Sequence, residues 1–278
     1  MLKRVLFIIL ISIVSVALFL YLFYSNKKNT SNQIDINKEE KHIVNISLSK
    51  KFYLFPEQTK NQILHYSKFS LSYNENAEQA DWVAYRLYPN SININVERRN
   101  NFRNDLKIRT SSASLEDYKG SGYDRGHLAP AKSMSFSEES MSESFLMSNM
   151  SPQLPSFNRG IWKKLEGQVR DWIAISDSLY VVTGPVLDTS LATIGVNKVL
   201  IPKAYYKAIL RFYEGEVNGI GFLLKHEKSS RKVTDFKTSI DYIEKITGLN
   251  FFNLLDSVQQ QKVESNNSFK DFLKIKNN

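Results

Sequence analysis

The chemically most informative stretch of this chain is residues 124–130, which read Asp-Arg-Gly-His-Leu-Ala-Pro. It places the imidazole of His127 two residues after the guanidinium of Arg125, with a glycine between them. An imidazole titrates near neutral pH and can take a proton from water, whereas a guanidinium matches the oxygens of a phosphate. In an extended segment both side chains would point to one face. We therefore interpret His127 as a general base. Arg125 would reach a phosphate oxygen or a neighbouring carboxylate, with a surface arginine without a role as the alternative.

An amide and a carboxylate follow downstream, at Asn158 and Glu166, and both offer the oxygen atoms that hard divalent cations prefer. Asn158 suits either the N-cap of a helix or a metal ligand. Eight residues of helix rise about 12 Å, too far for both side chains to bind one ion directly. Glu166 is therefore interpreted as a group that holds metal-bound water, with a solvated helix-face carboxylate as the alternative. One amide ligand with several waters suits Mg²⁺, with Mn²⁺ as a second choice.

Further polar residues are candidates for the same site. Asn149 is interpreted as a residue that holds the site loop or contacts metal-bound water, with a plain turn residue as the alternative. Arg99 is the candidate for a second phosphate clamp, and its neighbour Arg98 competes for that role. Asp124 is expected to orient Arg125 or a backbone amide.

The elements that must position these residues mix strands with helices. Strand-like patterns cover residues 69–73, 82–88, 180–185, 204–213 and 219–225. Helical patterns cover residues 140–147, 159–176 and 238–247, and Gly248 stops the last of them. Because strands and helices do not alternate strictly, we expect an α+β sheet domain.

Composition narrows the class of protein. The net charge of +9 favours a polyanionic partner, either nucleic acid or an anionic membrane surface. The chain has no Cys, which excludes disulfides and thiolate metal sites.

The N-terminus, residues 1–24, predicts a membrane anchor or a signal segment. Residues 5–24 are uncharged and largely apolar, and as a helix they would span about 30 Å, the thickness of the bilayer core. Bulky residues stand where signal cleavage needs small ones, which favours an uncleaved anchor. We expect the domain behind it to be exported, or secreted if cleavage does occur.

The rest of the chain divides by composition into three parts. Residues 25–50 are polar and predict a flexible tether. Residues 51–258 carry the aromatic residues and the motifs and predict the folded domain. Residues 259–278 predict a polar C-terminal tail that adds little to the core.

The motifs taken together carry a resemblance. Residues 124–130, then Ser-Asn-Met-Ser-Pro-Gln at 148–153, then Asn158-x3-Trp162-x2-Leu165-Glu166 resemble the DNA/RNA non-specific endonuclease family, whose site is a ββα-metal (His-Me) finger. Further family-like segments occur in the same order at residues 80–85, 182–185, 201–206 and 243–249. The resemblance covers about residues 71–255.

The resemblance implies a central antiparallel sheet flanked by helices, with His127 on one arm of the finger and Asn158 on its helix. It implies hydrolysis of single- and double-stranded DNA and RNA to 5′-phosphate ends. By position, His127 matches the base, Asn158 the metal ligand and Glu166 the water-holding carboxylate. Arg125 and Asn149 match auxiliary residues, and the upstream arginine of the family falls at Arg98 or Arg99.

A second hypothesis is a membrane-tethered protein that binds nucleic acid without cutting it. It predicts binding without turnover in a nuclease assay. The site positions all hold chemically competent residues, which favours the enzyme.

Overall fold

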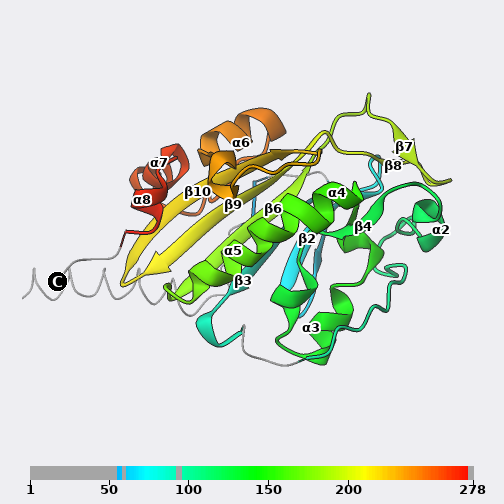
Figure 1. Cartoon of the computed structure of the whole chain (residues 1–278), viewed down its shortest axis with the longest axis horizontal. Helices are drawn as coiled ribbons and strands as arrows, with labels where there is room; N and C mark the ends of the chain where they lie inside the picture. Colours follow the sequence, from blue (N-terminus) through cyan, green and yellow to red (C-terminus); the bar gives the residue numbers. More distant parts are fainter. Residues whose placement is uncertain (1–54, 58–60, 92–95, 275–278) are drawn as a thin grey trace, which may run out of the picture. The chain divides into compact units, whose positions relative to one another are not determined.

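A seven-stranded antiparallel sheet organises the part of the chain that the computed structural model describes, residues 55–57, 61–91 and 96–274 (Figure 1). Its strand order is β1-β2-β3-β6-β9-β10-β11. The strands are β1 Gln62–His65, β2 Phe69–Asn74, β3 Gln79–Leu87, β6 Ser178–Val186, β9 Ala204–Tyr213, β10 Glu216–Lys225 and β11 Lys237–Thr238. The five predicted strands are therefore confirmed, with ends that shift by a few residues at most.

Helices cover both faces of this sheet. On one face α5 (Lys163–Ile173) buries Leu165, Val169 and Trp172, whose spacing of four and three residues forms one helical stripe. On the other face α6 (Ile240–Thr247) and α7 (Ser257–Ser265) pack against a second apolar cluster. Figure 1 shows α5 lying along the strands. The predicted α+β class, a central antiparallel sheet flanked by helices, is confirmed.

Local sequence sets the ends of α6. The hydroxyl of Ser239 accepts a hydrogen bond from the backbone N–H of Tyr242, which caps the first turn. Gly248 follows the helix with φ of 72°, the left-handed conformation that glycine adopts without strain. The predicted stop at Gly248 is therefore confirmed.

A small ββα unit lies beside the large sheet. β4 (Asp124–His127) pairs with β5 (Met150–Gln153), and the chain then enters α4 (Pro155–Phe157), the π-helical turn η4 (Asn158–Trp162) and α5. The predicted helix at 159–176 is thus one helix preceded by an irregular turn, because Gly160 has non-helical backbone angles. The other elements are η1 Pro89–Ser91, α2 Leu115–Tyr118, η2 Ala131–Met134, α3 Glu138–Glu143, η3 Met147–Asn149, β7 Thr193–Ile194, β8 Val199–Leu200, η5 Val233–Phe236 and α8 Phe269–Phe272.

Two expectations need correction. The helix predicted at 140–147 is α3, which begins and ends earlier, because Ser137 accepts from the N–H of Ser140 and caps it. The expectation that the C-terminal tail adds little to the core is wrong. Val263 of α7 and Phe272 of α8 are almost fully buried, and the buried Arg211 donates to the carbonyl of Phe272. The few apolar residues of this polar segment face the sheet.

The predicted anchor at residues 5–24 and the tether at 25–50 lie outside the described residues. Within the described ranges, no helix is both long enough and apolar enough to cross a bilayer.

Candidate active site

The ββα unit is fixed to the sheet through β5. The hydroxyl of Ser151 donates to the side-chain oxygen of Gln79 on β3 at 2.6 Å. The hydroxyl of Tyr205 on β9 donates to the carbonyl of Pro152 at 2.7 Å. β5 in turn pairs with β4, with Met150 opposite His127. The strand that carries the predicted base is therefore held by the central sheet rather than by a loop.

A glycine lets the two strands of this unit pack closely. A Cβ atom added to Gly126 would lie 2.2 Å from Cδ of Gln153, a distance that real side chains do not allow. Gln153 is fully buried, and neither polar atom of its amide has a hydrogen-bond partner among the described residues. The sequence analysis noted the glycine between Arg125 and His127 but did not single out Gln153. The closeness of Gln153 to Gly126 follows only from the pairing of β4 with β5.

His127 has a partly exposed side chain, but its Nε2 atom is buried and has no hydrogen-bond partner in the described part of the chain. Its ring meets those of Phe145 and Phe102 edge-on, with centroids 4.9 and 5.7 Å apart. Burial, followed by the charges of Arg98 and Arg125, lowers the pKa of His127 from 6.5 to about 3. The imidazole is therefore neutral at physiological pH and able to accept a proton.

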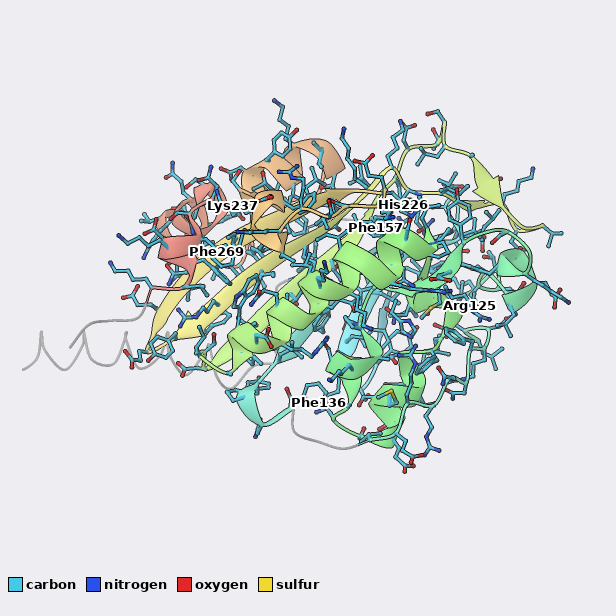
Figure 2. All side chains as sticks on the ribbon, viewed as in Figure 1. Arg125, Phe136, Phe157, His226, Lys237 and Phe269 are labelled. Atoms are coloured by element: carbon cyan, nitrogen blue, oxygen red, sulfur yellow. The ribbon has the colours of Figure 1, made fainter. Side chains whose placement is uncertain are left out.

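Two arginines stack on the rings that flank His127. The guanidinium of Arg125 lies 4.2 Å from the ring centroid of Phe102, and that of Arg98 lies 4.9 Å from the ring centroid of Phe145. Arg125 and His127 share Phe102 as a neighbour, which agrees with the predicted common face. Figure 2 shows Arg125 at the end of the molecule that carries β4.

The side chains of the adjacent residues Arg98 and Arg99 have different partners. Arg99 forms an ion pair with Glu138, the first residue of α3. Arg98 interacts electrostatically with both His127 and Glu166. The structure therefore brings Arg98 to the site and pairs Arg99, the residue chosen from the sequence, with a surface carboxylate instead.

Asn158 is anchored by Asp124. Its Nδ2 atom donates to a carboxylate oxygen of Asp124 at 2.9 Å, and Arg159 donates to both oxygens at 2.9 and 2.6 Å. Burial alone would raise the pKa of Asp124, but the hydrogen bonds from Arg159 and Asn158 hold it below its usual range. These partners differ from the predicted ones, Arg125 or a backbone amide. The anchored NH₂ group turns the carboxamide oxygen of Asn158 away from Asp124. Asn158 is not the N-cap of α5, because that position is held by Trp162.

Asn149 is buried and holds the loop that follows His127. Its side-chain nitrogen donates to the carbonyls of Ala129 and Ser144 at 3.0 and 2.8 Å. Its side-chain oxygen accepts from the N–H of Ala129 at 2.9 Å. Of the roles predicted for Asn149, this geometry fits the one that holds the site loop.

Glu166 lies on α5 among several cations. Burial raises the pKa of its carboxyl, and the charges of Lys207, Arg170, Arg98 and Lys163 oppose that rise. The sequence interpretation missed Lys207 and Arg170. A signal for Lys207 was present, because it is the only charged residue in the run from Ala204 to Leu210 of β9.

His226 positions the entry to the finger helix. Its Nε2 atom accepts from the N–H of Leu154 at 2.6 Å, and its Nδ1 atom lies 2.9 Å from the carbonyl of Pro202. Its ring packs edge-on against Phe157, with centroids 5.2 Å apart, and Figure 2 labels this pair. His226 thus holds the turn that leads to Asn158.

The ββα unit and its helix carry side-chain oxygen atoms of the kind that a hydrated divalent cation prefers. The carboxamide oxygen of Asn158, the carboxylate of Glu166 and the unpartnered amide of Gln153 all belong to β5 or to the helical segment that follows it. A different group of acidic residues, Asp241, Glu244 and Glu264, lies on α6 and α7. Two of its carboxylates accept hydrogen bonds, from the N–H of Phe251 and from Gln260, so the group is already engaged within the fold.

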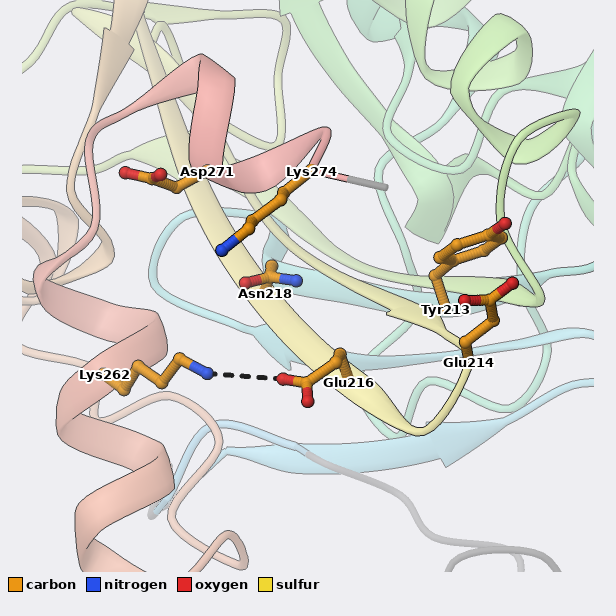
Figure 3. A pocket seen from close by; sticks show the side chains of 7 residues that line it. All are labelled: Tyr213, Glu214, Glu216, Asn218, Lys262, Asp271 and Lys274. Atoms are coloured by element: carbon orange, nitrogen blue, oxygen red, sulfur yellow. Dashed lines mark hydrogen bonds and ion pairs between the residues drawn. The ribbon is translucent and has the colours of Figure 1, made fainter. Parts of the chain in front are cut away.

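A separate hollow of about 260 Å³ lies at the turn between β9 and β10 (Figure 3). Charges of both signs line it, and Lys262 and Glu216 pair across it at 3.5 Å. Its lining residues are Tyr213, Glu214, Glu216, Asn218, Lys262, Asp271 and Lys274. None of them belongs to the ββα unit.

Comparison with known proteins agrees with this geometry. The model of a family described as DNA/RNA non-specific endonuclease matches residues 52–258. A nuclease of Syncephalastrum racemosum is 36% identical over 220 residues, covering 70% of this chain and 69% of that protein. A nuclease of a Nostoc species is 31% identical over 217 residues, covering 74% and 78%. A crystal structure of an EndoG/EndoGI complex contains a chain that superposes with a TM-score of 0.69 at 28% identity, covering 74% of this chain and 90% of that one.

Proposed function

Because the chain belongs to the DNA/RNA non-specific endonuclease family and is an enzyme of that class, we propose that it hydrolyses phosphodiester bonds in both DNA and RNA and leaves 5′-phosphate ends. The observation that carries this proposal is the neutral imidazole of His127, whose buried Nε2 atom has no partner among the described residues and which has Arg98 and Arg125 nearby. The same short strand anchors Asn158 through Asp124.

His127 acts as the general base. Its Nε2 takes a proton from a water molecule, and the oxygen of that water forms a bond to phosphorus. The bond from phosphorus to the 3′-oxygen breaks, and that oxygen takes a proton from solvent. The products are a 3′-hydroxyl and a 5′-phosphate, and His127 returns its proton to solvent.

Arg98 and Arg125 bind the phosphate charge. The rings of Phe145 and Phe102 hold the two guanidinium groups near His127, which reduces the entropy that each group loses on binding a phosphate. We assign this role to Arg98 rather than Arg99, because Arg99 is engaged with Glu138. Since no contact of this kind reads a base edge, cleavage is non-specific and binding falls steeply with salt.

Asn158 would hold the divalent cation, Mg²⁺ or Mn²⁺, through its carboxamide oxygen, and Glu166 would orient the water molecules around it. When bound, such an ion supplies positive charge for the developing negative charge on the phosphate oxygens. Asp124 contributes by fixing which end of the Asn158 amide faces the substrate.

The test uses plasmid DNA and total RNA with the full-length chain in Mg²⁺, in Mn²⁺ and in EDTA. We expect cleavage of both polymers with either metal and none in EDTA. His127→Ala should lower cleavage by about 10²- to 10⁴-fold while DNA binding persists. Cleavage that survives chelation contradicts the metal role. Binding without cleavage by the wild-type chain supports the alternative, a tethered nucleic-acid-binding protein.

We further propose that residues 1–24 anchor an exported domain. The apolar run at residues 5–24 supports this, since its length matches the bilayer core. The orientation is tested by comparing protease digestion of the domain in intact cells with its digestion in spheroplasts and in permeabilised cells. The mass of the mature chain tests whether the N-terminal segment is cleaved.

A further inference from the structure

A buried carboxyl group joins the edge of the large sheet to the segment that leads into the site. Only 2% of the surface of Asp105 is exposed, and no Lys or Arg side chain forms an ion pair with it within the described ranges. Its Oδ2 atom accepts from the hydroxyl of Tyr66 and, at 2.5 Å, from the hydroxyl of Ser148. Its Oδ1 atom accepts from the N–H of Lys107 at 3.0 Å. Removing a carboxylate from water is costly, and here three neutral donors compensate that cost.

Tyr66 is the sheet side of this network. It lies in the turn between β1 and β2, where its N–H donates to the carbonyl of Phe69 at 2.9 Å. Its ring stacks on the ring of Phe69, with centroids 4.5 Å apart. Phe69 is buried in the apolar cluster that α5 covers. The large sheet therefore determines where the hydroxyl of Tyr66 lies.

Ser148 is the site side of the network. It is fully buried in η3, between β4 and β5, and precedes Asn149. The side chain of Asn149 bonds both the N–H and the carbonyl of Ala129, and its own carbonyl accepts from the N–H of Leu128 at 3.0 Å. Leu128 and Ala129 directly follow His127 in the chain. The position of Ser148 therefore bears on the position of the imidazole.

We propose that Asp105 is a positioning residue, which fixes the loop after His127 relative to the large sheet. It acts through the hydroxyl of Ser148, and the hydroxyl of Tyr66 ties the same oxygen atom to the turn between β1 and β2. This is a second attachment of the ββα unit to the sheet, separate from the one through β5. The inference rests on the proposed function, because the loop bears on the reaction only if His127 is the base. A base that is held in place reacts faster than one that moves, since less entropy is lost on reaching the reactive geometry.

The experiment compares Ser148→Ala with Tyr66→Phe in the full-length chain. Each variant removes one hydroxyl group from the same oxygen atom of Asp105, but only Ser148 leads to the site. Circular dichroism and thermal melting establish that each variant is folded, and Ser148→Cys, with a weaker donor of similar volume, replaces Ser148→Ala if the latter folds poorly. We expect Ser148→Ala to lower kcat by about tenfold, with KM for DNA within about twofold of wild type. Tyr66→Phe should keep kcat within about threefold, although it too loses a hydrogen bond and melts at a lower temperature.

Hydrogen exchange provides a readout besides activity. The N–H groups of Leu128 and Ala129 are bonded to Asn149. In Ser148→Ala they should exchange about tenfold faster than in wild type, measured against the N–H groups of β9, which report the stability of the whole domain. In Tyr66→Phe the same ratio should stay within about threefold of wild type.

Variants of Asp105 itself test the carboxyl group. Asp105→Ala should lower kcat at least as much as Ser148→Ala does. Asp105→Asn keeps an oxygen atom for the two hydroxyl groups and should restore kcat to within about threefold of wild type. In the Asp105→Ala background, Ser148→Ala should cost less than about threefold further in kcat, because the bond between the two residues is already lost.

Failure of this inference differs from failure of the proposed function. If wild type cleaves DNA and folded Ser148→Ala keeps its kcat, or loses no more than Tyr66→Phe does, Asp105 has a merely structural role. Unchanged exchange at Leu128 and Ala129 in Ser148→Ala also overturns the inference. If wild type does not cleave at all, the proposed function fails, and exchange at these two residues still decides whether Asp105 holds the loop.

Discussion

Asp124 and Asn158 are joined by a hydrogen bond of 2.9 Å that connects the strand carrying His127 to the helical segment carrying the proposed metal ligand. The bond engages the NH₂ end of the amide and so determines where its oxygen points. Arg159 also pairs with Asp124, from the solvent side. The geometry of the site thus depends on a carboxylate that itself need not touch the substrate.

Asp124→Ala is expected to raise the Mg²⁺ concentration that gives half-maximal cleavage by about 10- to 100-fold, because a residue that orients a metal ligand contributes to metal affinity at this level. Arg159→Met is the matched control, since it removes the exposed ion pair and leaves the bond to Asn158, and it should change that concentration less than about threefold. Metal titrations of cleavage rate measure both. Equal effects of the two variants would show that metal affinity depends on the ion pair with Arg159 and not on the hydrogen bond to the Asn158 amide.

Arg98→Ala and Arg99→Ala should differ clearly in their effects on cleavage. Loss of a charged phosphate contact at Arg98 is expected to lower kcat/KM by about tenfold or more and to reduce the slope of log K against log salt by about 1. Arg99→Ala removes only a surface pair with Glu138 and should cost less than about threefold. Steady-state cleavage at several salt concentrations measures both, and a larger effect at Arg99 would return the assignment to that residue.

The titration of His127 predicts how stability depends on pH. Its pKa is about 3 in the folded chain and 6.5 ordinarily, so between these values the unfolded chain binds a proton that the folded chain does not. The free energy of unfolding must therefore decrease as pH falls through this window, by at most about 1.4 kcal/mol per pH unit.

His127→Phe keeps a ring at this position and cannot titrate. Between pH 6.5 and pH 5, wild type should lose up to about 2 kcal/mol more stability than this variant does. Denaturant unfolding of both chains at the two pH values provides the measurement. Equal losses of stability in the two chains would mean that the folded chain protonates His127 as readily as the unfolded chain does.

Gly126→Ala and Gly167→Ala should change the stability of the fold in opposite directions. An added Cβ at Gly126 collides with the buried Gln153, which should cost about 1–3 kcal/mol of stability and disturb the pairing that holds His127. At Gly167, inside α5, the nearest atom is the end of the Arg170 side chain at 3.8 Å, so alanine should stabilise the helix by about 0.5–1 kcal/mol. Thermal melting of both variants measures the difference, and stabilisation by Gly126→Ala would contradict the close packing of β4 and Gln153.

The sequence predicted the elements whose apolar residues repeat regularly. The strands β2, β3, β6, β9 and β10 and the helix α5 all have such patterns, and they appear in the structure close to the predicted bounds. The C-terminal helices α7 and α8 were not predicted, because their segment is polar and only isolated residues such as Val263 and Phe272 reach the core.

Within the site, the motif residues were identifiable but their partners were not. Arg98 and Arg99 are adjacent, and no regular element links them to His127, so only the positions of Glu138 and Phe145 distinguish them. Lys207 stands out in the sequence as a charge within the run 204–210, yet its position over the ring of Trp162 depends on how the helical segment lies across β9. Such pairings come from tertiary structure, which residue spacing does not encode.

The attachment of β5 to the large sheet has a consequence for how the enzyme responds to heat. Ser151 and Pro152 are bonded to Gln79 and Tyr205, and these two belong to β3 and β9 in the interior of the sheet. Fraying of the outer loops therefore leaves the distance between base and amide unchanged. Loss of cutting on heating should coincide with cooperative melting of the whole domain, with no earlier inactivated but folded stage.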